Sequence, residues 1–424
     1  MKKLIGMLNS HKELDGYKIA EKKTDSYELF FVHEKLETAR ATSTTDTGVT
    51  VYVDHDGKKG DSSFSLYASM SDEEIEKKIA QAAARAKLIS NEPYELPEGG
   101  ELRTELPENL SEYDDKELAA KIAKTVFTSP CPAGCTINAL EIFLYTDAFR
   151  VINSKGVDKT QVTRRVMIEA IPTFTDENES VELYQNCSFT IFDEEKLREE
   201  ISRKLCEVRD RRLAVKPGKE LKVRVVLRPE EISELMEELS YDLGYASVYT
   251  ESNLHKIGDD LQPGACDKLT LTRRAVTPGS EESGLFDADG TELTDTVLIK
   301  DGVVENYFGS SRFGQYLKVE KPTGVLNCMK VEPGTLTEEE LKREPYIECA
   351  SMSGMQVDLY NDYIGGEIRL AYYFDGEKTV PVSGVSMSGK LSEALAALRL
   401  SNQTITYRNY EGPDKLLLSD MTVL

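Results

Sequence analysis

Asp-Gly dipeptides between alternating apolar and polar segments constrain this chain more than any other feature. They occur at Asp56-Gly57, Asp289-Gly290, Asp301-Gly302 and Asp375-Gly376. An Asp-Gly pair favours the two-residue turn whose backbone twist matches that of two antiparallel strands. Segments rich in β-branched residues flank these turns, as 296–299 and 303–304 flank Asp301-Gly302. The sequence therefore predicts antiparallel β-hairpins in both halves of the chain.

The length of the chain predicts more than one domain. At 424 residues it is well beyond the size at which one hydrophobic core stops growing. The pattern changes near Val215-Lys216-Pro217-Gly218, where long ribbons give way to short strands and turns. We expect an α+β protein with an N-terminal α+β lobe over 1–215 and a β-rich domain over 216–424.

The N-terminal half predicts strands alternating with helices. A capping box of Ser71 and Glu74 opens a helix that runs to about Ile89. Further helices are expected at 114–127 and 193–213. Strands followed by a helix occur twice, at about 17–90 and 136–213, which indicates a duplicated strand-helix unit. The Pro-, Glu- and Gly-rich segment 91–109 is typical of a linker or a long surface loop.

The C-terminal half predicts a mostly antiparallel β domain. A strand at 223–227 precedes a short helix at 229–239 that has Pro229 at its start. Short strands separated by turns follow. A strand at 379–385 is expected to lead into a helix at 390–400, and a strand at 415–423 closes the chain.

Charge and apolar run length exclude two classes of protein. The chain has 52 Lys+Arg and 75 Asp+Glu, and the net charge of −23 repels the phosphate backbone of nucleic acids. Its longest apolar runs are five residues, such as 370–374 and 394–398, whereas a spanning helix needs about 20. The start of the chain lacks a secretory apolar region. We expect a cytoplasmic protein that binds neither nucleic acid nor membrane.

The residues alone predict no self-contained active site. The four histidines, His11, His33, His55 and His255, are scattered, and neither HExxH nor GxSxG occurs. Residues 384–390 match seven positions of a phosphate-binding loop, but Leu391 replaces its Ser or Thr. The seven cysteines are irregularly spaced, which favours reduced thiols. Cys131 and Cys135 lack a second ligand pair, and their role stays open.

Several segments of the second half, in order, are similar to one protein family. They are the helix at 229–239, Leu285-Phe286-Asp287-Ala288-Asp289-Gly290, the segment 298–307, Lys321-Pro322-Thr323-Gly324-Val325-Leu326-Asn327, and Val380-Pro381-Val382. In these segments, spread over 221–424, the chain resembles the TldD/PmbA family, also called modulators of DNA gyrase, whose PmbA branch is also named TldE. The first half agrees with the family in general pattern.

The resemblance implies a metallopeptidase homologue. The family's TldD-type subunit holds zinc through a helical HExxxH and a Cys near its C-terminus, and cleaves peptides as a dimer with a TldE-type partner. In this chain the HExxxH positions fall on 237–242, with Glu237 and Asp242 in place of the histidines. The terminal Cys-Gly-Lys stretch falls on about 411–413, where no Cys occurs. The usual zinc ligands are missing, as in the PmbA/TldE branch.

Glu237, Glu238 and Asp242 are the candidate site residues. Glu238 has the position of the family's catalytic glutamate, and Asp242 lies four residues further along the same helix face. Such carboxylates could bind a hard cation. Alternatively, acidic residues on an amphipathic helix form a solvated face.

Two functions remain open at this point. The chain is expected to be a non-catalytic TldE-like subunit of a peptide-cleaving zinc metalloprotease complex, without a cofactor of its own and with zinc in a partner. It would pair as a homodimer, or as a heterodimer with an HExxxH-bearing TldD-type subunit, and contribute to binding an extended peptide. The alternative is a stand-alone hydrolase or peptidase with a carboxylate-bound metal. The natural peptide is not predicted.

Overall fold

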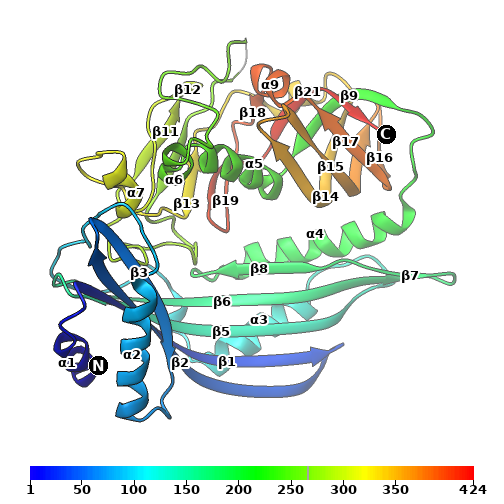
Figure 1. The fold of residues 1–424 in the computed structure, drawn as a ribbon. Helices are drawn as coiled ribbons and strands as arrows, with labels where there is room; N and C mark the ends of the chain where they lie inside the picture. Colours follow the sequence, from blue (N-terminus) through cyan, green and yellow to red (C-terminus); the bar gives the residue numbers. More distant parts are fainter. Residues whose placement is uncertain (265–266) are drawn as a thin grey trace.

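The computed structural model describes residues 1–264 and 267–424 and has two lobes, one stacked on the other (Figure 1). The N lobe is built on one large sheet from residues 16–189, and the C lobe on two sheets from residues 221–423. Helices pack against these sheets in both lobes. The predicted α+β class is confirmed.

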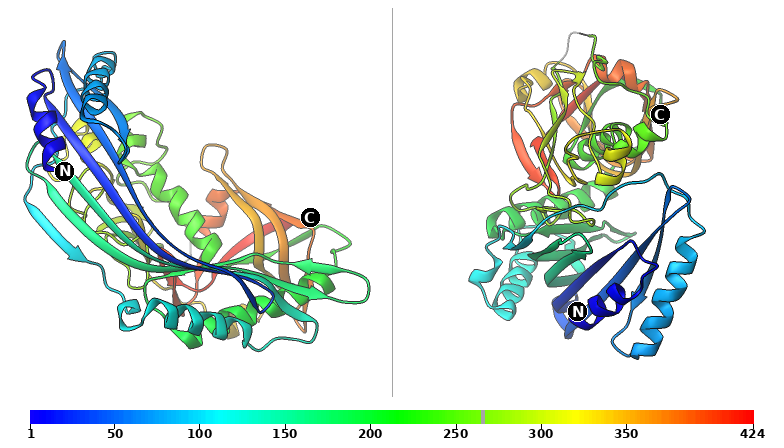
Figure 2. Two further views of the ribbon diagram at one scale, coloured as in Figure 1. Left: turned by 90° about the horizontal axis from the view of Figure 1, so that it is seen from below. Right: turned by 60° about the vertical axis from the view of Figure 1, so that its left-hand side comes forward.

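Long, curved strands form the N lobe sheet, in the order β3-β2-β1-β5-β6-β4, with β7 and β8 also paired to β6 (Figure 2). Its strands are β1 (Gly16–Val32), β2 (Lys35–His55), β3 (Lys58–Leu66), β4 (Glu101–Glu105), β5 (Cys135–Asn153), β6 (Asp158–Thr175), β7 (Ser180–Glu182) and β8 (Gln185–Phe189). Asp56 and Gly57, at φ 50° and 73°, form the β2–β3 turn, as the Asp-Gly pair predicts.

The order of elements in the N lobe occurs twice. Its helices are α1 (Lys2–Ser10), α2 (Asp72–Ala86), the 3-10 helix η1 (Leu110–Glu112), α3 (Asp115–Phe127) and α4 (Glu194–Leu213). Each unit has a helix, a long hairpin, a third strand and a second helix: α1-β1-β2-β3-α2, then α3-β5-β6-β8-α4. The units meet where β1 and β5 pair antiparallel. The duplicated order predicted from the sequence is therefore present in the topology.

The helix starts follow local sequence. The Ser71 side chain accepts a hydrogen bond from Glu74 N, and the Glu74 carboxylate accepts one from Ser71 N. This is the capping box that the sequence predicts. Asp114 caps α3 through its side chain. Ile79 and Ala82 on α2 lie in the same apolar cluster as Val49 and Val51 of β2.

The segment 91–109 is more structured than a linker. It contains β4, which pairs parallel to β6. Gln315 of the C lobe holds Glu95 by two hydrogen bonds of 2.9 Å, one to the backbone N and one to the backbone O. The Tyr316 hydroxyl donates to Glu92 O. The expectation of a loop is wrong for β4, because partners distant in the sequence supply its hydrogen bonds.

Two sheets make up the described part of the C lobe, ordered β12-β11-β10-β13-β20-β19 and β14-β9-β21-β17-β15-β16. Most pairs are antiparallel, as predicted, while β13–β20 and β9–β14 are parallel. The strands are β9 (Leu221–Leu227), β10 (Leu271–Arg274), β11 (Thr296–Lys300), β12 (Val303–Val304), β13 (Cys328–Val331), β14 (Tyr346–Asp358), β15 (Tyr363–Phe374), β16 (Thr379–Val382), β17 (Val385–Gly389), β18 (Arg399–Leu400), β19 (Thr404–Tyr407), β20 (Tyr410–Pro413) and β21 (Leu416–Val423).

The C lobe helices are α5 (Pro229–Asp242), α6 (Tyr245–Tyr249), α7 (Ser311–Tyr316), α8 (Glu338–Leu341) and α9 (Leu391–Ala396). α5 begins with Pro229, as predicted. Its apolar face, through Ile232, Leu235 and Met236, is buried in a core shared with strands of both sheets. This packing leaves the opposite, acidic face of α5 outside the core.

Two predicted boundaries near the C-terminus are wrong. The helix expected at 390–400 ends at Ala396, because Arg399 and Leu400 form β18 on β21. The strand expected at 379–385 is two strands, β16 and β17, which both pair with β15. Gly384, at φ +64°, separates them in a left-handed conformation that glycine adopts without strain.

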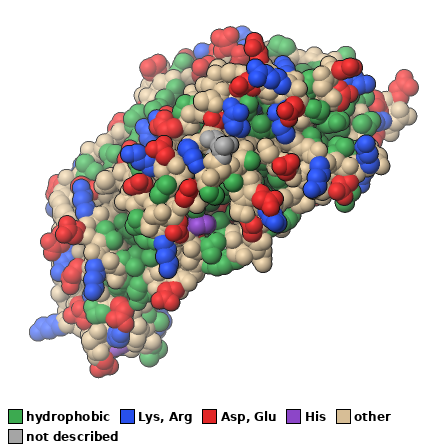
Figure 3. Space-filling view, turned by 90° about the horizontal axis from the view of Figure 1, so that it is seen from above, with side chains coloured by type: hydrophobic (Ala, Val, Ile, Leu, Met, Phe, Trp, Pro, Cys, Tyr) green, Lys and Arg blue, Asp and Glu red, His purple; other side chains and the backbone are tan. Residues whose placement is uncertain are grey.

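α4 connects the lobes. After it, Val215 N donates to Pro381 O of the C lobe, and the Tyr372 hydroxyl of β15 donates to Asp210 on α4 over 2.9 Å. No described helix is long and apolar enough to cross a membrane. Acidic and basic side chains are interspersed over the face of the molecule seen from above (Figure 3).

Candidate functional site

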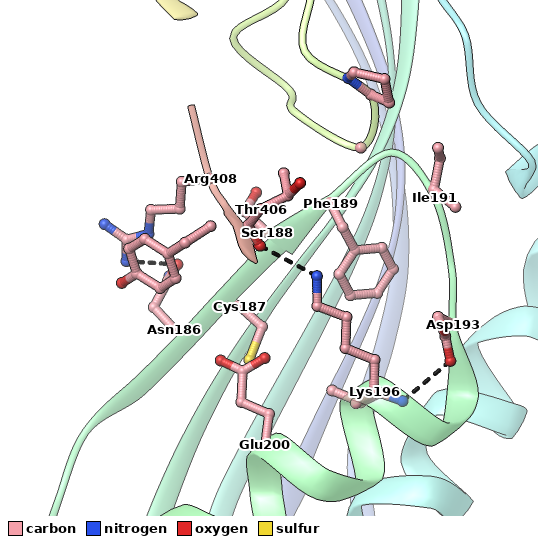
Figure 4. Close-up of a pocket in the computed structure, with 14 residues that line it drawn as sticks. Asn186, Cys187, Ser188, Phe189, Ile191, Asp193, Lys196, Glu200, Thr406 and Arg408 are labelled. Carbon is pink, nitrogen blue, oxygen red and sulfur yellow. Dashed lines mark hydrogen bonds between the residues drawn. The ribbon is translucent and has the colours of Figure 1, made fainter. Parts of the chain in front are cut away.

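A cavity of about 230 Å³ lies between the lobes. The N lobe contributes β8 and the start of α4, and the C lobe contributes the loop at 278–279 and the end of β19 (Figure 4). It is lined by Asn186, Cys187, Ser188, Phe189, Ile191, Asp193, Lys196, Leu197, Glu200, Pro278, Gly279, Thr406, Tyr407 and Arg408. A ligand here would contact both lobes.

Two strands with an unpaired edge flank this cavity. β8 pairs with β6 and β19 pairs with β20, and neither has a second strand partner among the described residues. Lys196 extends from α4 and donates from Nζ to Thr406 O over 3.2 Å (Figure 4). Thr190 N donates to Gly279 O over 3.0 Å. An unpaired strand edge can accept an extended peptide as an added strand.

The cavity continues past the β19–β20 turn. A second cavity, of about 410 Å³, shares Asn186, Tyr407 and Arg408 with the first. Arg408 lies in the turn at φ 49°, a left-handed conformation that is uncommon outside glycine. Its Nη2 lies 3.4 Å from Asn186 Oδ1 of the N lobe. The turn therefore separates two halves of one cleft between the lobes.

Burial sets the pKa values of two groups in this cleft. Burial raises the pKa of the Cys187 thiol far above its usual range, and Glu200 adds to the effect. This thiol is therefore protonated at neutral pH and is a poor nucleophile. Burial, followed by the nearby Glu230 carboxylate, raises the pKa of Tyr407. Neither group has the lowered pKa of an activated nucleophile.

Glu237 on α5 is paired with an arginine. Its Oε2 accepts from Arg273 Nη1 over 2.9 Å, and its Oε1 accepts from Asn409 Nδ2 over 3.0 Å. The side chain of Arg273 is 4% exposed and also donates to Leu326 O. Both carboxylate oxygens of Glu237 therefore already have protein partners, one of them a guanidinium. Glu237 thereby anchors the β19–β20 turn to α5.

Asp242 holds the chain that follows α6. The buried carboxylate accepts from Leu254 N over 2.6 Å, from His255 N over 3.0 Å and from His255 Nδ1 over 3.0 Å. Burial would raise its pKa, but these hydrogen bonds keep it below the usual value. Both carboxylate oxygens of Asp242 therefore accept hydrogen bonds from the protein. Asp242 therefore has a structural role in this conformation.

Glu238 is exposed and does not join the other two carboxylates. It has no hydrogen bond or ion pair within 1–264 and 267–424. Those residues also contain no group of three His, Cys, Asp or Glu side chains that could hold a metal ion. The residues at 237–242 do not fit the zinc site of the family, because two carry protein partners and the third stands alone.

The segment that replaces the family's terminal Cys is also engaged. Glu411 lies on β20 and accepts from Arg274 Nη1 over 2.8 Å. Arg273 and Arg274, neighbours on β10, therefore pair with Glu237 and Glu411. These two arginines supply the positive charge that faces Glu237 and Glu411.

Two of the family-like segments are brought together by one buried aspartate. Asp287 accepts from Asp289 N and Thr291 N within its own turn, and from Val325 N of the segment 321–327. They line a further cavity of about 350 Å³ with Phe149 and Gln161 of the N lobe. Their position between the lobes indicates that they shape this interface.

Cys131 and Cys135 are placed differently. Cys131 is exposed, whereas Cys135 is buried and donates from Sγ to Leu205 O of α4 over 3.1 Å. Burial, followed by Cys131, raises the pKa of Cys135 to about 11. The buried thiol packs α4 against β5, which is a structural role.

The sequence offered no motif for the polar residues that line the cleft or that pair with Glu237. Lys196, Arg408, Arg273 and Asn409 are single polar residues outside any recognised pattern. Arg408-Asn409 occupies a two-residue turn without glycine, so even the turn is weakly signalled. Their roles follow from contacts between segments that are 36 to 222 residues apart.

Comparison with known proteins identifies relatives of the C-terminal domain and of the fold. Residues 220–424 match the PmbA/TldA metallopeptidase C-terminal domain. No curated protein matches the chain by sequence. The fold is similar to that of TldE from Thermococcus kodakarensis, with a TM-score of 0.80, 16% identity, and coverage of 100% of this chain and 99% of the other.

Two further solved structures have the same fold. A candidate modulator of DNA gyrase from Bacteroides thetaiotaomicron has a TM-score of 0.79 and 16% identity, over 100% of this chain and 97% of the other. Another from Thermotoga maritima has a TM-score of 0.77 and 15% identity, over 100% and 99%. Residues 220–424 therefore carry a PmbA/TldD-type C-terminal domain, and the whole chain has the same fold as TldE and these two structures.

Proposed function

We propose that this chain is a non-catalytic, TldE-like subunit of a peptide-cleaving metalloprotease complex, and that it helps to bind an extended peptide in the cleft between its lobes. One observation carries the proposal: the carboxylates at the HExxxH positions are engaged or isolated rather than convergent. Glu237 pairs with Arg273, and Asp242 accepts two backbone amides and His255. Catalytic zinc would belong to a partner subunit.

The cleft between the lobes supports the part of the proposal that concerns peptide binding. A peptide strand can satisfy its backbone groups on an unpaired edge, whereas a folded domain cannot enter a slot between two strands. The edges of β8 and β19 flank the cavity from opposite lobes. In this proposal unfolded substrates are bound and folded ones are excluded.

A second unpaired edge supports assembly. Residues 35–46 of β2 are exposed and, among the described residues, pair with β1 alone, because β3 covers β2 from Thr47 onward. A long exposed edge of this kind is a site for pairing with another chain. We assign it to assembly, with a second copy or with an HExxxH-bearing homologue.

Co-expression with an HExxxH-bearing homologue tests the proposal. A stable complex that cleaves unfolded peptides, combined with an inactive isolated chain, is the expected result. Elemental analysis of the isolated chain should find no stoichiometric metal. Stoichiometric metal together with peptidase activity lost in Glu238→Gln would instead favour the stand-alone enzyme.

A further inference from the structure

We propose that the larger part of the interlobe cleft is a carboxylate-binding subsite that selects peptides with an acidic side chain or a free C-terminus. The proposal rests on the peptide-binding function above and adds the chemical class of substrate. It concerns the cavity of about 410 Å³ on the far side of the β19–β20 turn. Its charged lining residues are Lys204, Arg211, Arg369, Arg408, Glu182 and Glu230.

The cations of this cavity come from both lobes. Lys204 and Arg211 lie on α4 of the N lobe, while Arg369 lies on β15 and Arg408 in the β19–β20 turn of the C lobe. Four cations thus face two carboxylates, in a chain whose net charge is −23. The sign of the cavity is opposite to that of the protein as a whole, which makes it a local attractor for anions.

The contacts of each group leave three arginines without a carboxylate partner. Lys204 is paired with the buried Glu207, at 2.8 Å between Nζ and Oε2. Arg211 donates to the backbone carbonyl of Glu182 over 2.8 Å. Arg408 has the 3.4 Å contact to the Asn186 amide oxygen, and Arg369 is exposed. In the described chain neither Arg369 nor Arg408 forms an ion pair.

The two carboxylates of the cavity form no ion pair with these arginines in the described chain and offset their charge only in part. Glu182 accepts hydrogen bonds from Asn138 and Thr173 on the N lobe sheet. Glu230 lies in the first turn of α5, and no ion pair involves it among the described residues. Two carboxylates therefore face three arginines, which leaves one positive charge for a ligand.

The arginines of this cavity indicate which chemical group of a ligand it would bind. A planar guanidinium binds a carboxylate through two parallel hydrogen bonds, and such charged pairs are stronger than neutral ones. The cavity adjoins the slot between β8 and β19, with which it shares Asn186, Tyr407 and Arg408. A peptide in that slot would place its carboxylate in this cavity. The carboxylate can come from an Asp or Glu side chain or from the C-terminus.

A matched peptide series tests the inference on the purified full chain. One neutral, unstructured peptide is made in four forms: amidated, with a free C-terminus, amidated with one Glu, and amidated with one Lys. At constant ionic strength we expect the two carboxylate forms to bind at least about tenfold more tightly than the neutral amide, and the Lys form no better than it. The free C-terminus and the Glu form distinguish the two sources of the carboxylate.

Variants of the cavity arginines test whether the preference for a carboxylate arises in this cavity. Arg369→Gln and Arg408→Gln should each reduce the ratio of carboxylate to amide affinity toward one. Arg343→Gln is the matched control, because Arg343 is an exposed C lobe arginine that does not line the cavity, and it should leave both affinities unchanged. Circular dichroism and the melting temperature of each variant verify folding.

Two results would overturn the inference, and they differ from each other. Equal binding of charged and neutral peptides, or a preference that persists in both arginine variants, removes the carboxylate subsite and leaves peptide binding intact. If no peptide binds in any form, even with an HExxxH-bearing partner present, the proposed function falls and the subsite falls with it.

Discussion

Arg228 donates from Nη1 to Glu207 Oε1 over 2.6 Å and so joins α5 of the C lobe to α4 of the N lobe. Its Nε donates to Glu348 on β14 over 2.8 Å. Burial alone would raise the pKa of Glu207, but Lys204 and Arg228 hold it below its usual value. A buried ion pair therefore holds α4 of the N lobe against the start of α5 in the C lobe.

Glu207→Ala should destabilise the protein strongly. It removes the carboxylate partner of Lys204 and leaves Arg228 with Glu348 alone, and breaking a buried pair costs about 3–5 kcal/mol. The free energy of unfolding in urea measures the loss. Glu393→Ala, which breaks the exposed pair with Lys390, is the control and should change the free energy of unfolding far less, because solvent screens an exposed ion pair. Similar losses in the two variants would contradict the structural role of Glu207.

Glu231 should make stability depend on pH. Burial, followed by the charge of Glu230, raises the pKa of this α5 carboxyl to about 7, and its Oε2 has no hydrogen-bond partner in the described chain. The folded state holds the proton that the unfolded chain releases near pH 4.5. The contribution of Glu231 to the free energy of unfolding therefore falls between about pH 4.5 and 7 and is constant above.

The variant Glu231→Gln tests the predicted direction of this pH dependence of stability. The variant should be more stable than the parent at pH 8 by up to about 3 kcal/mol, and the difference should vanish near pH 4. Urea unfolding across this range provides the measurement. A difference that does not change with pH would assign the effect to packing.

Neutralising Asp242 should cost stability, whereas neutralising Glu238 should have almost no effect. Asp242→Asn weakens hydrogen bonds to Leu254 and His255 and should cost about 1.5–3 kcal/mol of stability, as charge-assisted bonds do. Because the pKa of Asp242 is lowered, this contribution is present above the unfolded pKa and is lost as the pH falls through the folded value. Glu238→Gln, at an exposed site, should change stability by less than about 0.5 kcal/mol. A large loss in Glu238→Gln would indicate a role that its exposed position does not explain.

Gly60 should tolerate no side chain. A Cβ at this β3 position would lie 1.9 Å from Ala86 O at the end of α2, so the helix would have to move. Gly60→Ala should cost about 2–3 kcal/mol, which is typical of overpacking. Gly218→Ala is the control, because nothing lies within 4 Å of its Cβ position. Thermal unfolding followed by circular dichroism compares the two, and equal melting temperatures would contradict the close approach of α2 to β3.

Short-range features could be predicted from the sequence because the groups involved lie within a few residues of one another. The Ser71–Glu74 capping box, the cap at Asp114, Pro229 at the start of α5 and the Asp56-Gly57 turn are all present. The repeated order of strands and helices was also visible, because each unit has its own local pattern. The family-like segments of the second half identified the fold.

Tertiary structure decided the rest. β4 and β18 depend on pairing with β6 and β21, and no window around Glu101 or Arg399 contains those partners. The sequence placed Glu237, Glu238 and Asp242 on one helix, but only the fold set Arg273 against Glu237 and His255 against Asp242. The cleft likewise combines Arg211 with Arg369 and Arg408. Local sequence determines where helices and turns begin, whereas the partner of each charge is chosen by packing between distant segments.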